Sequence, residues 1–257
     1  MTTVLAVSGK GGVGKTAMAS LVVGYLIEEG LKPILAVDAD SNSNLDLALG
    51  IELESTVGSV REEMSRRTQK GTLPAGMAKQ DILEMQIEQA LVETKDFDLI
   101  SMGRPEGPGC YCAINNMLRV FLDRLNKSYE YVVVDNEAGM EHLSRRTTRG
   151  INVMFVVSDP SMRGLATAMR IRDLAREMEI GVERFALVVS RVRGELPQTL
   201  ADEISGLDID LAGVIPDDPE VAKYDEEGRP LVELPGSSAA RAAVREIMES
   251  VLQDVRG

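Results

Sequence analysis

The sequence predicts an α/β fold in which a doubly wound, mostly parallel sheet is flanked by helices, and three observations lead to this prediction. Short apolar runs rich in valine, leucine and isoleucine recur along the chain, and stretches with helical periodicity separate them. Glycine-rich or acidic turns stand where several of the runs end. At 257 residues and 44% hydrophobic content, the chain can bury one large core. We therefore expect a single domain over residues 1–257, with parallel strands joined by right-handed crossovers.

The order of the expected elements follows from these runs. A strand at residues 4–7 precedes a packed helix that begins near residue 15, and a second strand at 33–37 precedes a short helix near 44–47. The more charged segment of about 51–96 is expected to be a mostly helical insertion that offers a partner surface. Further strands are predicted at 97–102, 131–134, 153–157, 185–189 and 211–215.

The turn after the first strand matches the phosphate-binding pattern G-x-x-x-x-G-K-[ST]. Its glycines let backbone N–H groups surround phosphate oxygens, its lysine neutralises them, and its final hydroxyl is suited to Mg²⁺. The N-terminal end of the following helix adds a favourable dipole. The predicted nucleotide-binding residues are Gly9, Lys10, Gly11, Gly12, Val13, Gly14, Lys15 and Thr16.

A second lysine, Lys10, stands inside this loop, and a second buried ammonium beside Lys15 would need its own anionic partner. The string Gly-Lys-Gly-Gly-Val-Gly-Lys-Thr resembles the deviant Walker A motif of the MinD, ParA, ArsA and nitrogenase iron protein group. The resemblance implies an ATPase fold of the P-loop class. It also implies that Lys10 and Lys15 are catalytic, with Lys10 reaching the phosphates of a partner subunit when a homodimer closes on ATP.

Acidic residues end two of the predicted strands. Asp38 and Asp40 follow the second strand, and Asp135 ends the strand at 131–134, so all three carboxylates are expected at the ligand-binding edge of the sheet. The family resemblance implies that Asp40 orients the attacking water and that Asp38 supports the Mg²⁺ shell. Either residue could instead cap the helix near 44–47.

The residues after Asp135 fit the Asp-x-x-Ala-Gly pattern of a Walker B and switch II segment. Asp135 would hold Mg²⁺ through water, and the backbone of Gly139 would respond to the γ-phosphate. Glu137 is a less favoured base, because the family assigns that role to the first switch. The strand at 185–189 ends in Ser190-Arg191 where many relatives have Asn-Lys. Base recognition is therefore expected from backbone groups near Pro216, with Arg191 stacking on the ring.

The two cysteines of the chain, Cys110 and Cys112, stand in a Cys-x-Cys arrangement. Such a pair can be inert, can form a strained redox link, or can bind a metal as thiolates, and one chain then supplies half of a tetrahedral site. A symmetric homodimer would supply the other half, giving four sulfurs suited to Zn²⁺, Ni²⁺ or an iron–sulfur cluster. His142, the one histidine, is expected to be a packing or hydrogen-bonding residue.

The cysteine pair, the deviant Walker A motif and the segment Glu141-His142-Leu143 together resemble the CooC family of nickel-insertion ATPases. This resemblance implies Ni²⁺ or Zn²⁺ at the cysteines and a client nickel enzyme, carbon monoxide dehydrogenase or acetyl-CoA synthase. Two other functions stay open. One is an iron–sulfur scaffold or reductase ATPase, and the other is a positioning ATPase of the MinD and ParA type that binds no metal.

Net charge restricts the partners of this chain. At -13, most of the surface should repel DNA phosphates and anionic lipids, so neither a nucleic acid nor a membrane is expected as a partner. The segment 239–254 carries mixed charge and is expected to be a helix docked on the core rather than a basic membrane-binding helix. No apolar run reaches transmembrane length, and we expect a cytoplasmic location.

Overall fold

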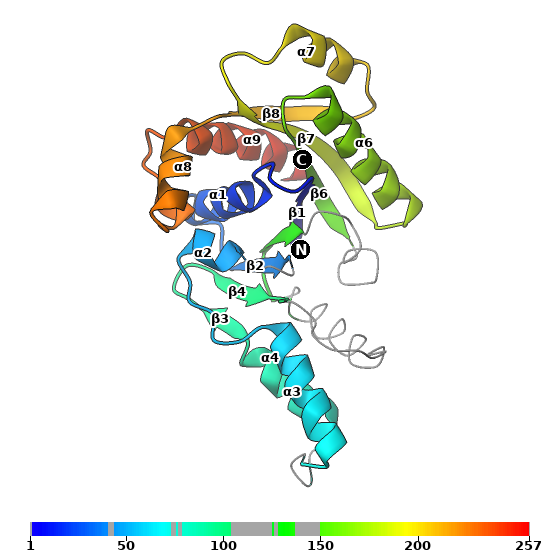
Figure 1. The fold of residues 1–257 in the computed structure, drawn as a ribbon, viewed down its shortest axis with the longest axis vertical. Helices are drawn as coiled ribbons and strands as arrows, with labels where there is room; N and C mark the ends of the chain where they lie inside the picture. Colours follow the sequence, from blue (N-terminus) through cyan, green and yellow to red (C-terminus); the bar gives the residue numbers. More distant parts are fainter. Residues whose placement is uncertain are drawn as a thin grey trace.

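A computed structural model of the chain describes residues 2–40, 44–72, 76, 79–103, 125, 128–136 and 150–256. Strands and helices alternate along most of this part of the chain (Figure 1). In chain order the elements are β1 (Thr3–Gly9), α1 (Lys15–Glu28), β2 (Ile34–Ala39), α2 (Leu45–Leu49), α3 (Val57–Lys70), α4 (Lys79–Glu88), β3 (Leu91–Glu93), β4 (Asp98–Ser101), β5 (Tyr131–Asn136), β6 (Ile151–Ser158), α6 (Met162–Glu177), β7 (Val182–Val192), α7 (Gln198–Ser205), β8 (Asp210–Pro216), α8 (Pro219–Glu226), the 3₁₀ turn η2 (Leu231–Glu233) and α9 (Ala239–Arg256).

The described strands form one sheet of eight, in the order β3-β4-β2-β5-β1-β6-β7-β8. Neighbouring strands pair in parallel on both sides of β1, which confirms the predicted doubly wound fold. The strand β3 was not expected, and it pairs with β4 in the antiparallel direction. Four residues join β3 to β4, too few for the crossover that a parallel pair requires, so the chain can only turn back on itself.

The core lies on both faces of the sheet. Along β1, Leu5 and Val7 face one apolar cluster whereas Val4 and Ala6 face the other, as the two-residue period of a strand requires. Helices α1, α2, α8 and α9 cover the first face, and α3, α4, α6 and α7 cover the second. In Figure 1, α1 and α9 lie on one side of the strands and α6 lies on the other. Burial on both faces explains why the central strands are almost entirely apolar in sequence.

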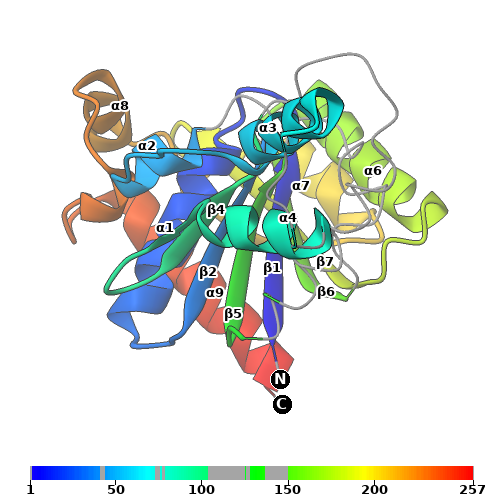
Figure 2. The same ribbon diagram turned by 90° about the horizontal axis from the view of Figure 1, so that it is seen from below.

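The segment of about 51–96 contains α3, α4 and β3. A capping box between Thr56 and Ser59 starts α3, and Gly71 ends it in a left-handed conformation, so both ends follow local sequence signals. Helices α3 and α4 lie side by side at one end of the molecule, next to β3 and β4 (Figures 1 and 2). Their buried residues join the second apolar cluster. The domain boundaries expected for this insertion stay a prediction.

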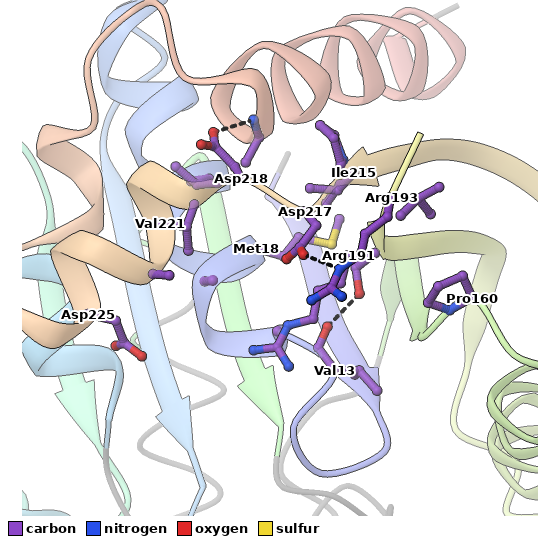
Figure 3. A pocket seen from close by; sticks show the side chains of 18 of the residues that line it. Val13, Met18, Pro160, Arg191, Arg193, Ile215, Asp217, Asp218, Val221 and Asp225 are labelled. Atoms are coloured by element: carbon purple, nitrogen blue, oxygen red, sulfur yellow. Dashed lines mark hydrogen bonds and ion pairs between the residues drawn. The ribbon is translucent and has the colours of Figure 1, made fainter. Parts of the chain in front are cut away.

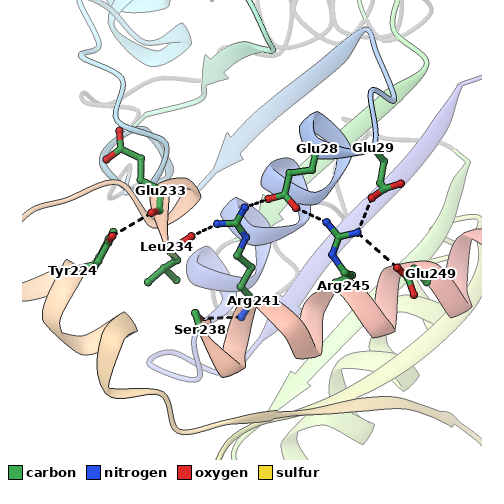
Figure 4. Close-up of polar contacts among 9 residues, drawn as sticks. All are labelled: Glu28, Glu29, Tyr224, Glu233, Leu234, Ser238, Arg241, Arg245 and Glu249. Carbon is green, nitrogen blue, oxygen red and sulfur yellow. Dashed lines mark hydrogen bonds and ion pairs between the residues drawn. The ribbon is translucent and has the colours of Figure 1, made fainter. Parts of the chain in front are cut away.

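Helix α9 is docked along α1, as its mixed charge predicted. Its apolar side, which includes Val244, Met248 and Val251, is buried in the first cluster. Its polar side carries two arginines that bind the far end of α1: Arg241 binds Glu28, and Arg245 binds both Glu28 and Glu29 (Figure 4). Apolar packing and ion pairs therefore hold the two helices together. Within the described ranges, no helix has the length and apolar character needed to cross a membrane.

Candidate functional site

Three neighbouring strands end together at one edge of the sheet. In the register of the sheet, Asp135 of β5 stands beside Val7 of β1 on one side and beside Asp38 of β2 on the other. Two residues beyond Val7, β1 ends at Gly9, and the predicted phosphate-binding loop begins there. The fold thus brings the loop and two of the predicted carboxylates to one place, as the positions of the strand ends predicted.

The loop at 10–14 has a backbone that its glycines make possible. A Cβ atom on Gly9 would lie 2.5 Å from the carbonyl oxygen of Val157, so the close approach of β6 excludes any side chain there. Gly14, with φ of 90°, is the N-cap residue of α1 in a left-handed conformation that favours glycine. The loop therefore leads from a tightly packed strand directly into the N-terminal end of a helix, which is an anion-binding arrangement.

The two lysines of the loop have different surroundings. Lys15 is buried, with 7% of its surface exposed, and its Nζ lies 3.5 Å from the carbonyl oxygen of Lys10. Lys10 is exposed. Lys15 thus lies within the cradle, whereas the Lys10 side chain is accessible from outside the subunit. The trans-acting role of Lys10 stays a prediction.

Thr16 and Asp135 make direct contact. The Thr16 hydroxyl donates a hydrogen bond to Oδ2 of Asp135 over 2.6 Å. Burial raises the pKa of Asp135 to about 7, although the hydrogen bond from Thr16 opposes the shift, and the charge of Asp38 adds to it. Oδ1 of Asp135 is buried and has no hydrogen-bond partner among the described residues.

This pair fits Mg²⁺. A buried carboxylate oxygen that accepts no hydrogen bond is stabilised by a cation or by the water ligands of a cation. Hydroxyl and carboxylate oxygens are the ligands that Mg²⁺ prefers. Thr16 and Asp135 are the residues that would hold it. When bound, the ion would neutralise charge on the phosphate chain.

Asp38 acts as a cap. Its two carboxylate oxygens accept hydrogen bonds from the backbone N–H groups of Asp40, over 3.0 Å, and Leu45, over 3.1 Å, and Leu45 is the first residue of α2. Burial raises its pKa to about 6 against the effect of these two bonds. The structure therefore shows a capping contact for Asp38, and its support of the Mg²⁺ shell stays a prediction. Asp40 is half-buried at the end of the described segment 2–40, and its role in orienting water stays a prediction.

A cavity of about 620 Å³ opens beside the phosphate-binding loop (Figure 3). It lies between the first turns of α1, the end of β7 and the connection from β8 to α8, and its size is in the range of small-molecule sites. Both residues that were predicted to surround a base, Arg191 and Pro216, line it. The apolar lining includes Met18, Ile215 and Val221. Val13 and Gly14 of the loop also line the cavity. A nucleotide with its phosphates at the loop could therefore place its base in the cavity.

Ser190 and Arg191 contact the loop itself. The Ser190 hydroxyl is buried and lies 2.5 Å from the carbonyl oxygen of Val13 and 3.3 Å from that of Ser158. The Arg191 guanidinium donates to the carbonyl oxygen of Gly12 over 2.7 Å. Sequence reasoning treated Ser190 only as the replacement of a base-reading amide, and it missed this contact. Stacking of Arg191 on a base stays a prediction.

Two further residues at this edge have roles that were not predicted. Asn136 is buried and donates from Nδ2 to the carbonyl oxygen of Val7 over 3.0 Å, so it fixes β5 against β1. Asp218 caps α8 and also accepts hydrogen bonds from Ser238 and from the backbone N–H of Ala240 in α9. Its position before Pro219 was the available signal, since an acidic N-cap followed by proline marks a helix start.

The cysteines predicted to bind metal, Cys110 and Cys112, lie outside the described residues, as do Gly139 and His142. The chain that leads to the cysteines leaves the sheet at the carboxyl end of β4, where Ser101 stands beside Asp38 in the register. In the part of the chain that the structure describes, no cluster of three or more histidine, cysteine, aspartate or glutamate residues could hold a metal ion.

A glycine loop between a central parallel strand and a helix, with a buried lysine and a threonine–aspartate pair at the next strand, defines a nucleotide-binding protein of the P-loop class. Comparison with protein-family models agrees with this class. The chain belongs to the CobQ/CobB/MinD/ParA nucleotide-binding domain family, whose model matches residues 4–231.

Similar proteins cover nearly the whole chain. An uncharacterized ATP-binding protein of Methanocaldococcus jannaschii is 47% identical over 249 residues, which is 97% of this chain and 98% of that protein. The carbon monoxide dehydrogenase accessory protein CooC of Rhodospirillum rubrum is 30% identical over 264 residues, covering 98% and 97%. Among solved structures, the MinD cell division protein of Aquifex aeolicus has a TM-score of 0.69 at 22% identity, covering 98% and 97%, which shows the shared fold.

Proposed function

We propose that this protein is an ATP-hydrolysing homodimer that carries a metal ion, Ni²⁺ or Zn²⁺, and delivers it to a client nickel enzyme, carbon monoxide dehydrogenase or acetyl-CoA synthase. The observation that carries the proposal is the Cys110-x-Cys112 pair, which follows β4 in a chain 30% identical to a carbon monoxide dehydrogenase accessory protein. Since β4 ends beside Asp38, the segment with the cysteines starts at the same edge of the sheet as the nucleotide site.

The residues at that edge support ATP hydrolysis. Lys15 would neutralise phosphate charge from its buried position, and Thr16 and Asp135, which contact each other, would hold Mg²⁺. Asp40 orients the attacking water, and the exposed Lys10 reaches the phosphates of the partner subunit. Hydrolysis would then be coupled to closing and opening of the dimer.

Metal binding follows from the same symmetry. Each chain brings two thiolates, and a two-fold axis between the chains would bring four together, which completes a tetrahedral site. The ion is cargo in this scheme, and opening of the dimer after hydrolysis releases it to the client. Binding of ATP and binding of metal both favour the closed dimer, so each should strengthen the other.

Metal analysis of anaerobically purified protein, with and without ATP, tests this function. We expect one Ni²⁺ or Zn²⁺ per dimer in the wild type, and none in the double variant Cys110→Ser/Cys112→Ser, which should still bind ATP through its intact loop. The matched control is His142→Ala, which removes the one histidine and should keep the metal.

Other results would support the two remaining functions. An iron–sulfur cluster in place of a single ion would favour a scaffold or reductase ATPase. Wild-type protein without metal that binds vesicles or DNA in the presence of ATP would favour a positioning ATPase. The docked helix α9 and the net charge of -13 both weigh against that last outcome.

A further inference from the structure

The end of β7 has an irregular backbone next to the phosphate-binding loop. Arg191 has φ of 58°, a left-handed conformation that is unfavourable for a residue other than glycine. At the same place, the pairing of β7 with β8 shifts its register between Val189 and Val192, which marks a bulge. Bulges and strained residues of this kind gather beside functional sites, where they redirect side chains.

The irregularity lets two consecutive side chains reach one loop. In a regular strand the side chains of Ser190 and Arg191 would point to opposite faces. Here Ser190 bonds the carbonyl oxygen of Val13, and Arg191 bonds the carbonyl oxygen of Gly12. Two adjacent residues of β7 therefore hold two adjacent carbonyl groups of the loop, and Figure 3 shows Val13 and Arg191 together at the wall of the cavity.

Holding these carbonyl groups also orients the N–H groups that follow them. In a trans peptide the C=O of one residue and the N–H of the next point in opposite directions. With the carbonyl groups of Gly12 and Val13 turned toward β7, the N–H groups of Val13 and Gly14 are turned away from it. Backbone N–H groups of this loop are the ones that bind phosphate oxygens.

We propose that Ser190 and Arg191 are positioning residues for the phosphate chain: they hold the outer carbonyl groups of the loop so that its N–H groups face the phosphates before nucleotide arrives. We call the pair Ser190 and Arg191 the clamp. Its role rests on the proposed function only because ATP is taken as the ligand. It assigns Arg191 to the phosphate end of the site, whereas stacking would assign it to the base end.

Competition against a fluorescent ATP analogue separates the two roles of Arg191. Tripolyphosphate carries phosphates without a base, and adenosine carries a base without phosphates. In Arg191→Met, we expect the inhibition constants of ATP and tripolyphosphate to rise about tenfold, since a charge-assisted hydrogen bond to the loop is lost. That of adenosine should stay unchanged. Ser190→Ala removes an uncharged hydrogen bond, and we expect a rise of about fivefold for the same two ligands.

A second arginine variant distinguishes positioning from a general loss of structure. Arg191→Gly removes the guanidinium but suits the left-handed backbone, so its melting temperature should fall less than that of Arg191→Met while tripolyphosphate binding weakens as much. Arg191→Lys should recover part of the affinity. The control Arg170→Met removes one exposed positive charge from α6 and should bind both ligands as the wild type does.

Two results would overturn the clamp. One is wild-type tripolyphosphate binding in both Arg191→Met and Arg191→Gly. The other is weakened adenosine binding with tripolyphosphate unchanged, which would assign Arg191 to the base. Failure of the proposed function would look different: the wild type itself would bind ATP but show no hydrolysis or no metal.

Discussion

Asp218 should contribute far more to stability than its position on a loop suggests. One of its carboxylate oxygens accepts from the backbone N–H of Glu220 over 2.9 Å, and the other accepts from the Ser238 hydroxyl over 2.7 Å and from the N–H of Ala240 over 3.0 Å. A single side chain thus caps the first turns of both α8 and α9, and Figure 3 shows its contact at the start of α9. Replacing it by alanine removes all three bonds.

The expected cost follows from these contacts. Loss of a capping side chain costs about 1 kcal/mol for each helix. Ser238 is 1% exposed, and loss of its bond to Asp218 adds about 1 kcal/mol. Asp218→Ala should therefore lower the free energy of unfolding by about 3 kcal/mol, which corresponds to a fall of roughly 6–12 °C in melting temperature for a domain of this size. Asp218→Asn keeps one accepting oxygen and should lose about half as much.

Urea unfolding, monitored by circular dichroism, measures the difference in free energy of unfolding between the wild type and each variant. Asp217→Ala is the matched control, because Asp217 is the adjacent acid and pairs with Arg193, whose side chain is 87% exposed. The ion pair of Asp217 with Arg193 should contribute less than about 1 kcal/mol to the free energy of unfolding. If Asp218→Ala unfolds at the same urea concentration as Asp217→Ala, the double cap does not stabilise the protein, and the reasoning is wrong.

Acid provides a second check on the same residue. Burial alone would raise the pKa of Asp218, but hydrogen bonds from the N–H of Ala240, the Ser238 hydroxyl and the N–H of Glu220 outweigh it and lower the pKa. The folded state therefore binds a proton less readily than the unfolded state. Its stabilising effect is complete above pH 4 and is lost as the pH falls below that value. The difference in free energy of unfolding between the wild type and Asp218→Asn should therefore become smaller as the pH falls below 4.

Three further predictions concern the nucleotide site. Burial raises the pKa of Asp38 to about 6 and that of Asp135 to about 7, so the folded state binds protons that the unfolded state has already released. The free energy of unfolding of the nucleotide-free protein should therefore fall as the pH rises from 4 to 8. Asp135→Asn should reduce this pH dependence in thermal melts. Gly9→Ala places a methyl group against the backbone of Val157, so it should lower the free energy of unfolding by at least about 2 kcal/mol and weaken ATP binding. Wild-type stability and wild-type ATP affinity in this variant, both measured by calorimetry, would contradict the packing argument. Lys10→Ala should bind ATP normally but neither dimerise with ATP nor release phosphate, and ATP-driven dimers of this variant in light scattering would exclude a trans-acting role.

Patterns that depend on neighbouring residues could be predicted from sequence. The loop from Gly9 to Thr16, the strands of the core and the position of Asp135 all followed from short motifs and from the apolar runs of doubly buried strands. The strand β3 could not be predicted, because three residues without clear alternation carry no strand signal of their own. Its direction depends on the length of the link to β4.

Contacts between distant parts of the chain were also out of reach. Ser190 and Val13 are separated by 177 positions, and nothing in either local sequence indicates that they meet. The left-handed backbone of Arg191 is a consequence of the bulge, and arginine gives no sign of it. Asp38 illustrates the converse: sequence reasoning identified the residue and its two possible roles, and only the geometry shows which backbone N–H groups it caps.

The ion pairs between α1 and α9 hold the end of α1 that lies farthest from the phosphate-binding loop. The first turn of α1 carries Lys15 and Thr16, and its last turn is bound through Glu28 and Glu29 to the arginines of α9. A helix held in this way at both ends can shift only together with β5 and α9.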